Sequence, residues 1–165
     1  MKEQKLANSL NIPLEKAREL MTKYMAKWKA VGRFFDGTQN YLAENGYVYT
    51  FLGRRRYLPD IRSPQPYQRF RAGRQGANSI IQGAAAEIAK CSMLRLHREK
   101  RLEQIGWRLL LQIHDELVCE GPPETLELAK AIIKDAMENP FAPFTTFGAP
   151  LQAKPVSGPS WWACK

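Results

Sequence analysis

The order of apolar and polar residues predicts helices over the first 45 residues. Apolar residues recur every three or four positions between residues 3 and 30, which is the spacing of one face of a helix. Asn11-Ile12-Pro13 interrupts the pattern, and Glu15 follows in the first turn of a new helix, where proline is tolerated. A second helix is expected over residues 31–45, with Asn45-Gly46 as its C-terminal signal. The stripe predicted to pack in a core consists of Leu14, Ala17, Leu20, Met21, Tyr24 and Trp28.

The rest of the pattern predicts a mixture of strands and helices. Residues 47–52 are rich in β-branched and aromatic side chains and Gly53 closes them, so a strand of a hairpin is expected there. A long alanine-rich helix is expected over residues 71–97, with a core side formed by Ile80, Ile81, Ile88 and Met93. The later elements are two short strands at 107–113 and 117–120, a helix from residue 122 to about 139, and a loop at 139–160 in which residues 150–156 can form a last strand. This order of elements is typical of an α+β fold.

Three titratable residues, His114-Asp115-Glu116, separate the two later strands. Burying unpaired charges is costly, so the interruption is either a solvated turn or a site that binds a cation. An Asp-Glu pair would also serve as a general acid and base if it faced a pocket. As a metal site the pair suits Mg²⁺, which prefers one or two carboxylates together with waters and substrate phosphates. The pattern leaves these three interpretations open.

Composition narrows the class of partner. The 165 residues carry a net charge of +9, which favours an anionic partner such as nucleic acid or phospholipid. No apolar run approaches the ~18 residues that cross a membrane, and the N-terminus lacks the apolar core of a secretory signal. Cys91, Cys119 and Cys164 are far apart and odd in number, which fits reduced thiols in an intracellular protein and not a disulfide framework or a zinc site.

The segment from residue 54 to residue 74 is strongly basic. It contains a single acid, Asp60, and prolines at positions 59, 64 and 66 are expected to exclude regular structure from its middle and argue against a membrane-bound amphipathic helix. A solvated charged face is one interpretation. The other is phosphate binding, because guanidinium groups form bidentate phosphate contacts and the interleaved Tyr57, Tyr67 and Phe70 can stack on sugars or bases. The arginines are Arg54, Arg55, Arg56, Arg62, Arg69, Arg71 and Arg74.

Three polar residues follow on one face of the expected long helix. Arg74, Asn78 and Gln82 are four residues apart and would span about 12 Å of helix. Such side chains contact base edges and the sugar-phosphate backbone, although exposed helix faces are polar in most proteins. The basic segment, the polar helix face and the turn carboxylates together fit phosphoryl transfer, in which a divalent ion offsets phosphate charge.

Several ordered motifs resemble those of the family A DNA polymerases, the bacterial polymerase I type. Gln112-Ile-His-Asp-Glu-Leu-Val118 resembles the family's C motif, and Gly53-Arg-Arg-Arg-Tyr-Leu-Pro-Asp60 resembles its G-R-R-x-x-L-P-D segment. Arg74, Asn78 and Gln82-Gly83 match its R-x-x-x-N-x-x-x-Q-G helix, and Gly158-Pro-Ser-Trp161-Trp-Ala163 resembles its G-x-x-W-x-x-A terminus. The resemblance runs from about Leu6 to Lys165, and residues 139–165 are most similar to plant and protist organellar branches.

The resemblance implies a role for each matched residue. Asp115 would be one of two catalytic aspartates that bind Mg²⁺, with Glu116 as a supporting carboxylate, and His114 would contact the primer terminus. Arg74, Asn78 and Gln82 would track primer-template DNA through its minor groove, and Arg54 and Arg55 would bind backbone phosphate. The implied fold is a helical fingers segment followed by a partial antiparallel palm sheet with packed helices. Residues 1–73 would be the rear of the fingers with the basic segment, and residues 74–165 the C-terminal part of the palm.

Two family motifs do not occur in this sequence: D-Y-S-x-I-E-x-R, with the other metal-binding Asp, and the nucleotide-binding helix R-x-x-x-K-x-x-x-F/Y-G-x-x-Y-G. The resemblance therefore implies a C-terminal portion of a polymerase of the bacterial cytoplasm or an organelle, inactive alone because a two-metal site needs both aspartates. The complete enzyme would bind primer-template DNA and deoxynucleoside triphosphates, and a chain with the missing motifs would make this one half of a split enzyme. The alternative is a non-catalytic, basic module that binds duplex DNA. Missing neighbours would leave apolar surface exposed.

Overall fold

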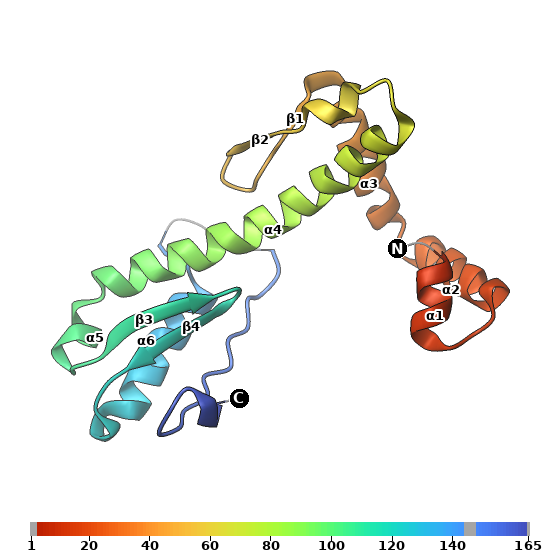
Figure 1. The fold of residues 1–165 in the computed structure, drawn as a ribbon. Helices are drawn as coiled ribbons and strands as arrows, with labels where there is room; N and C mark the ends of the chain where they lie inside the picture. The colour runs from red at the N-terminus through yellow and green to blue at the C-terminus, as the bar shows by residue number, and fades with distance from the viewer. Residues whose placement is uncertain (1–2, 144–147, 165) are drawn as a thin grey trace. The chain divides into compact units, whose positions relative to one another are not determined.

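The computed structural model describes residues 3–143 and 148–164, which belong to two compact units (Figure 1). The first unit contains the chain up to Tyr49 together with Arg54–Ile80. The second contains Thr50–Gly53 and the chain from Ile81 onward. The short segment Thr50–Gly53 therefore belongs to the second unit although the residues on both sides of it belong to the first.

Three helices open the first unit: α1 (Glu3–Leu10), α2 (Leu14–Lys27) and α3 (Lys29–Asn45). The break at residues 11–13 is confirmed. α3 ends as predicted at Gly46, whose φ of 78° suits a residue without Cβ and whose N–H donates to the Leu42 carbonyl at 2.8 Å. The second break differs from the prediction, because the backbone already leaves the helical region at Trp28, with φ −113° and ψ 60°.

A small core lies between α3, a hairpin and the start of the long helix. β1 (Tyr47–Tyr49) pairs antiparallel with β2 (Arg55–Tyr57), and a 3₁₀ turn follows over Pro59–Arg62. β1 is shorter than the predicted strand 47–52 because the chain leaves the hairpin at Thr50. The buried residues of this core are Leu42, Val48, Leu58 and Ala72, with Ile61 and Ile80 packed against them.

The apolar stripe predicted for α2 is mostly exposed. Ala17 is buried, whereas Leu20, Tyr24 and Trp28 are 41, 53 and 52% exposed. The prediction of a packed stripe is therefore wrong for this structure. The exposed residues of the stripe are instead part of the apolar surface that is expected to lie open because neighbouring segments are missing.

The long helix α4 spans Pro66–Arg98 and begins five residues before the predicted start at residue 71. Proline suits the first position of a helix, because the N–H that it lacks would have no acceptor there. Pro59 likewise opens a 3₁₀ turn, so the prediction of irregular structure is wrong at Pro59 and Pro66. It holds around Pro64, where residues 63–65 form neither helix nor strand. The predicted core residue Ile81 is also 52% exposed.

The second unit packs a hairpin with helices (Figure 1). β3 (Arg108–Ile113) pairs antiparallel with β4 (Glu116–Glu120), and their register shifts between Leu109 and Leu111. The helices are the second half of α4, the unpredicted α5 (Lys100–Gln104) and α6 (Leu126–Glu138), which follows a 3₁₀ turn at Pro123–Thr125; another 3₁₀ turn spans Trp162–Cys164. The core residues are Leu96, Leu102, Ala129, Ile132 and Ala136. Helices with two small antiparallel sheets confirm the α+β class.

No strand forms over residues 150–156, so that prediction is wrong. Two prolines, Pro150 and Pro155, lack the N–H that a sheet ladder requires. The Ala153 N–H between them donates instead to the Glu138 side chain, at 3.0 Å.

A buried carboxylate on α4 holds the connection between β1 and β2. Glu87 is 4% exposed, and its oxygens accept hydrogen bonds from the Thr50 hydroxyl and, at 2.8 Å, from the Leu52 N–H. One turn earlier, Gly83 leaves room for Thr50, because a Cβ there would lie 2.4 Å from the Thr50 Cγ2. Glu87 and Gly83 together fix the segment Thr50–Gly53 against α4.

We predict that Glu87→Ala lowers the free energy of unfolding by about 2–4 kcal/mol, because it deprives the Thr50 hydroxyl and the Leu52 N–H of their acceptor and opens a cavity. Glu87→Gln keeps the volume but turns one acceptor oxygen into a donor, so its loss should be intermediate. Urea unfolding followed by circular dichroism measures both. Glu103→Ala, at an exposed glutamate of α5, is the matched control and should cost less than about 0.5 kcal/mol. Equal losses at the two positions would contradict the role of Glu87.

Candidate functional site

The His-Asp-Glu sequence forms the tip of the β3–β4 hairpin. Ile113 pairs with Glu116, so His114 and Asp115 make a two-residue turn. The predicted turn is confirmed, but Glu116 is the first residue of β4 and does not belong to it. His114 has a φ of 54°, in the left-handed region, which costs a residue with a Cβ roughly 1–2 kcal/mol. The three side chains are exposed, as a solvated turn or a ligand site requires.

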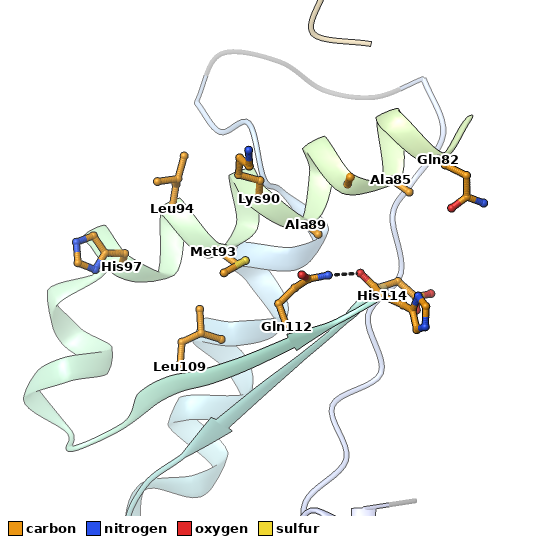
Figure 2. A pocket seen from close by; sticks show the side chains of 12 residues that line it. Gln82, Ala85, Ala89, Lys90, Met93, Leu94, His97, Leu109, Gln112 and His114 are labelled. Atoms are coloured by element: carbon orange, nitrogen blue, oxygen red, sulfur yellow. Dashed lines mark hydrogen bonds between the residues drawn. The ribbon is translucent and has the colours of Figure 1, made fainter. Parts of the chain in front are cut away.

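An open groove of about 990 Å³ lies between α4 and this hairpin, within the second unit (Figure 2). It brings together three residues predicted from separate motifs: Gln82 of α4, and His114 and Asp115 of the turn. Figure 2 shows Gln82 and His114 at one end, and Met93 and Leu109 farther along the groove. Its other lining residues are Ala85, Ala86, Ala89, Lys90, Leu94, His97 and Gln112. Three small side chains on the helix side, Ala85, Ala86 and Ala89, leave room in the groove.

Three polar residues of this groove were missed as site residues. The Gln112 amide donates a hydrogen bond to the backbone carbonyl of His114, two residues along the strand, and so braces the strained turn (Figure 2). Lys90 and His97 lie on α4, eight and fifteen positions after Gln82. The helical spacing of both residues from Gln82 was the available signal. It was overlooked because the alanines between them have no polar or reactive group.

The hairpin carries two neighbouring carboxylates, at Asp115 and Glu116. Asp115 and Glu116 carry the hard oxygen donors that Mg²⁺ prefers. Within residues 3–143 and 148–164, no group of three or more His, Cys, Asp and Glu side chains is placed to hold a metal ion. These residues fit Mg²⁺ only if further oxygen ligands come from phosphates, waters or another segment.

Cysteine chemistry at the hairpin is not supported. Burial raises the pKa of the Cys119 thiol on β4 to about 11, so the thiol stays protonated at neutral pH and is a poor nucleophile.

The arginines of the basic segment are not alike: two exposed arginines, Arg62 and Arg69, bond to backbone carbonyls. Arg62 donates to the Glu44 carbonyl at 2.9 Å, and Arg69 donates to the carbonyls of Ser63 and Pro64 at 2.8 and 2.9 Å. Arg62 therefore ties its segment to α3, and Arg69 holds the loop that precedes α4. Arg55 is exposed, and its guanidinium lies over the rings of Tyr47 and Tyr49.

The other predicted DNA-binding residues lie on the first unit. Arg54 is exposed in the connection that leads into β2. Arg74 and Asn78 are exposed on α4, eight and four positions before Gln82, and the Arg74 guanidinium lies 5.1 Å from the centre of the Phe70 ring. None of these three residues lines the groove of the second unit.

Comparisons with known proteins agree with the motifs. The family model described as DNA polymerase family A matches residues 1–163. The chain is 39% identical over 160 residues to DNA polymerase I of Geobacillus stearothermophilus, which covers 97% of this chain and 18% of that protein. It is 35% identical over 160 residues to the mitochondrial DNA polymerase I B of Oryza sativa subsp. japonica, covering 97% of this chain and 16% of that protein. The chain thus spans a small part of the length of these relatives.

A solved structure shares the fold. The POL domain of Pol1 from M. smegmatis, in complex with DNA primer-template and dNTP, aligns with a TM-score of 0.81 and 30% identity over 92% of this chain and 26% of that chain. Bacterial and plant organellar relatives have similar identities, so they indicate the family and not one of its branches. In the described part of the chain, no helix combines the length and apolar character that a membrane crossing requires. Because the family model matches nearly all of its residues, the chain belongs to DNA polymerase family A.

Proposed function

We propose that the chain is the C-terminal portion of a template-directed DNA polymerase, which transfers nucleotidyl groups to a primer end. The observation that carries the proposal is the groove of the second unit, where Gln82 of the helix motif meets His114 and Asp115 of the C motif. Two motifs that are distant in sequence, and that the resemblance links to DNA, line one open surface. The M. smegmatis domain was solved with DNA primer-template and dNTP, which supports the same partners for the complete enzyme here.

The roles in this proposal follow the chemistry of the side chains. Asp115 is the catalytic metal-binding residue, Glu116 supports it, and bound Mg²⁺ would offset the negative charge of the reacting phosphates. His114, which is exposed at the turn and lines the groove, contacts the primer end. The minor-groove row is Arg74, Asn78 and Gln82, and the phosphate contacts are Arg54 and Arg55.

The proposed subdomains follow the order of the chain. Residues 1–73 would form the rear of the fingers and residues 74–165 the C-terminal part of the palm. The compact units divide α4 slightly later, between Ile80 and Ile81. Because the relatives include bacterial, mitochondrial and chloroplastic polymerases, we infer a bacterial cytoplasmic or organellar enzyme.

We predict that a polypeptide of these 165 residues does not extend a primer by itself, because a two-metal site needs a second aspartate. A second chain that carries the D-Y-S-x-I-E-x-R motif and the nucleotide-binding helix should restore extension. Asp115→Asn should abolish the restored activity, whereas Glu124→Gln, at an exposed glutamate after the hairpin, should not. Gel-resolved primer extension with Mg²⁺ and all four nucleotides measures these outcomes. Template-directed extension by the isolated chain would overturn the prediction.

We predict that the chain binds blunt duplex DNA with an affinity that falls as salt rises, because arginine-phosphate contacts release counterions. Arg54→Ala should reduce the slope of log affinity against log salt by about 1. Arg101→Ala should leave the slope unchanged, because Arg101 lies on α5 and outside the basic segment of residues 54–74. Fluorescence anisotropy across a salt series gives both values.

The alternative is a non-catalytic module that binds duplex DNA, favoured by the exposed arginines and by the incomplete metal site. Duplex binding that survives Asp115→Asn, together with no extension when the complementary chain is supplied, would favour this module over the polymerase.

We predict that His114→Gly stabilises the chain and weakens duplex binding. Glycine removes a backbone cost of roughly 1–2 kcal/mol in the folded state. It also gives the unfolded chain more conformational entropy, which destabilises the folded state by about 0.5–1 kcal/mol. The free energy of unfolding should therefore rise by roughly 0.5–1 kcal/mol. The imidazole contact with DNA is lost at the same time. Urea unfolding and anisotropy measure the two effects, and a variant that gains both stability and affinity would contradict the proposed role.

A further inference from the structure

The outward face of the β1–β2 hairpin carries a cluster of aromatic rings around one arginine. Successive residues of a strand point to opposite faces, and Val48 of β1 points into the core. Its neighbours Tyr47 and Tyr49 therefore point outward, opposite their cross-strand partners Tyr57 and Arg55. With Tyr41 of α3, these four residues form what we call the tyrosine–arginine cluster.

The members of this cluster contact one another. The Tyr47 ring lies 5.2 Å from Tyr49 and 5.5 Å from Tyr57, measured between ring centres. The Arg55 guanidinium lies 5.0 and 5.5 Å from the centres of Tyr47 and Tyr49, and its Nε donates to the Tyr49 hydroxyl at 3.1 Å. Hydrogen bonds to the hydroxyls of Tyr57 and Tyr49 raise the pKa of Arg55 further. The cation is thus held in place beside the rings.

Tyr57 stands at the edge of the cluster with most of its surface in solvent. It is 63% exposed, although an aromatic ring of this size gains free energy when it is buried. The β1–β2 face offers it no cover, since all three residues of β2 are exposed. Arginines occupy the positions directly before it, from residue 54 to residue 56. An aromatic face beside fixed positive charge matches the chemistry of a stacked base with its phosphate.

We propose that the tyrosine–arginine cluster is a binding site for unpaired bases of single-stranded DNA, with Tyr57 as the stacking platform and Arg55 as the adjoining cation. The proposal rests on the proposed function, which supplies DNA as the partner. Single-stranded DNA fits better than duplex, because bases inside a duplex already stack on each other and hide their faces. A second copy of this chain would bind poorly to the cluster, because the three adjacent arginines of one copy would repel those of the other.

The test compares two DNA ligands in anisotropy titrations of the full chain: a blunt duplex, and the same duplex with a 5′ overhang of six thymidines. The overhang should strengthen binding about five-fold or more. Tyr57→Ala should lose this gain and keep the blunt-duplex affinity, whereas Tyr57→Phe, which keeps the ring, should retain the gain. Tyr24→Ala, at a similarly exposed tyrosine of α2, should also retain it. Thermal unfolding should show that all three variants remain folded.

The outcomes separate this inference from the proposed function. Blunt-duplex binding without a gain from the overhang, or a gain that survives Tyr57→Ala, would overturn the stacking site alone. No binding to either ligand would overturn the proposed function as well. A dimer that dissociates on Tyr57→Ala in sedimentation would show that a second copy occupies the face and would also overturn the site.

A photochemical measurement provides a readout that affinity does not. Bromouracil placed in the overhang should form an ultraviolet cross-link to Tyr57, identified by mass spectrometry of the digested chain. Adducts found only outside the tyrosine–arginine cluster would count against the proposal.

Discussion

The carboxylate of Glu87 is the constraint on which the middle of the chain depends. A buried carboxylate is tolerated only where donors surround it, so the connection after β1 has to bring the Thr50 hydroxyl and the Leu52 N–H to α4. The approach is possible only because Gly83, one turn away, has no side chain. The connecting segment Thr50–Gly53 is therefore fixed on the same helix that lines the groove.

The groove lies between a helix face with small side chains and a hairpin turn with a strained backbone. Alanines on α4 leave room in it, while the β3–β4 turn places His114 in a backbone conformation that residues with a Cβ adopt at a cost. Gln112 braces that turn through a hydrogen bond to the His114 carbonyl. Strain that surrounding contacts maintain is common where a side chain has to be presented to a ligand. A turn without this strain would be more stable, but it would fix the orientation of the imidazole and of the adjoining carboxylate less strictly.

The local pattern predicted much of the fold, and the errors have physical causes. The C-terminal end of α3 and the β3–β4 hairpin follow from local signals, Gly46 and the two short apolar runs separated by His-Asp-Glu. The packed stripe of α2 failed because periodicity shows which side of a helix is apolar but not whether anything covers it. Pro66 was misinterpreted because proline excludes a helix interior but favours its first turn. For the groove, motif spacing indicated Gln82 and His114, while the helical spacing of Lys90 and His97 from Gln82 was overlooked because neither residue belongs to a recognised motif.

The length of the hairpin turn has a consequence for how this region can vary. Only two residues separate the paired positions Ile113 and Glu116. One inserted residue would shift the register of β4 and turn its core side chains, such as Leu117, to the opposite face. Substitution at the tip changes one side chain, whereas an insertion or deletion would disturb both the core and the carboxylate of Asp115. Related hairpins are therefore expected to keep this spacing, and a gap in an alignment at this point would be a sign of lost function.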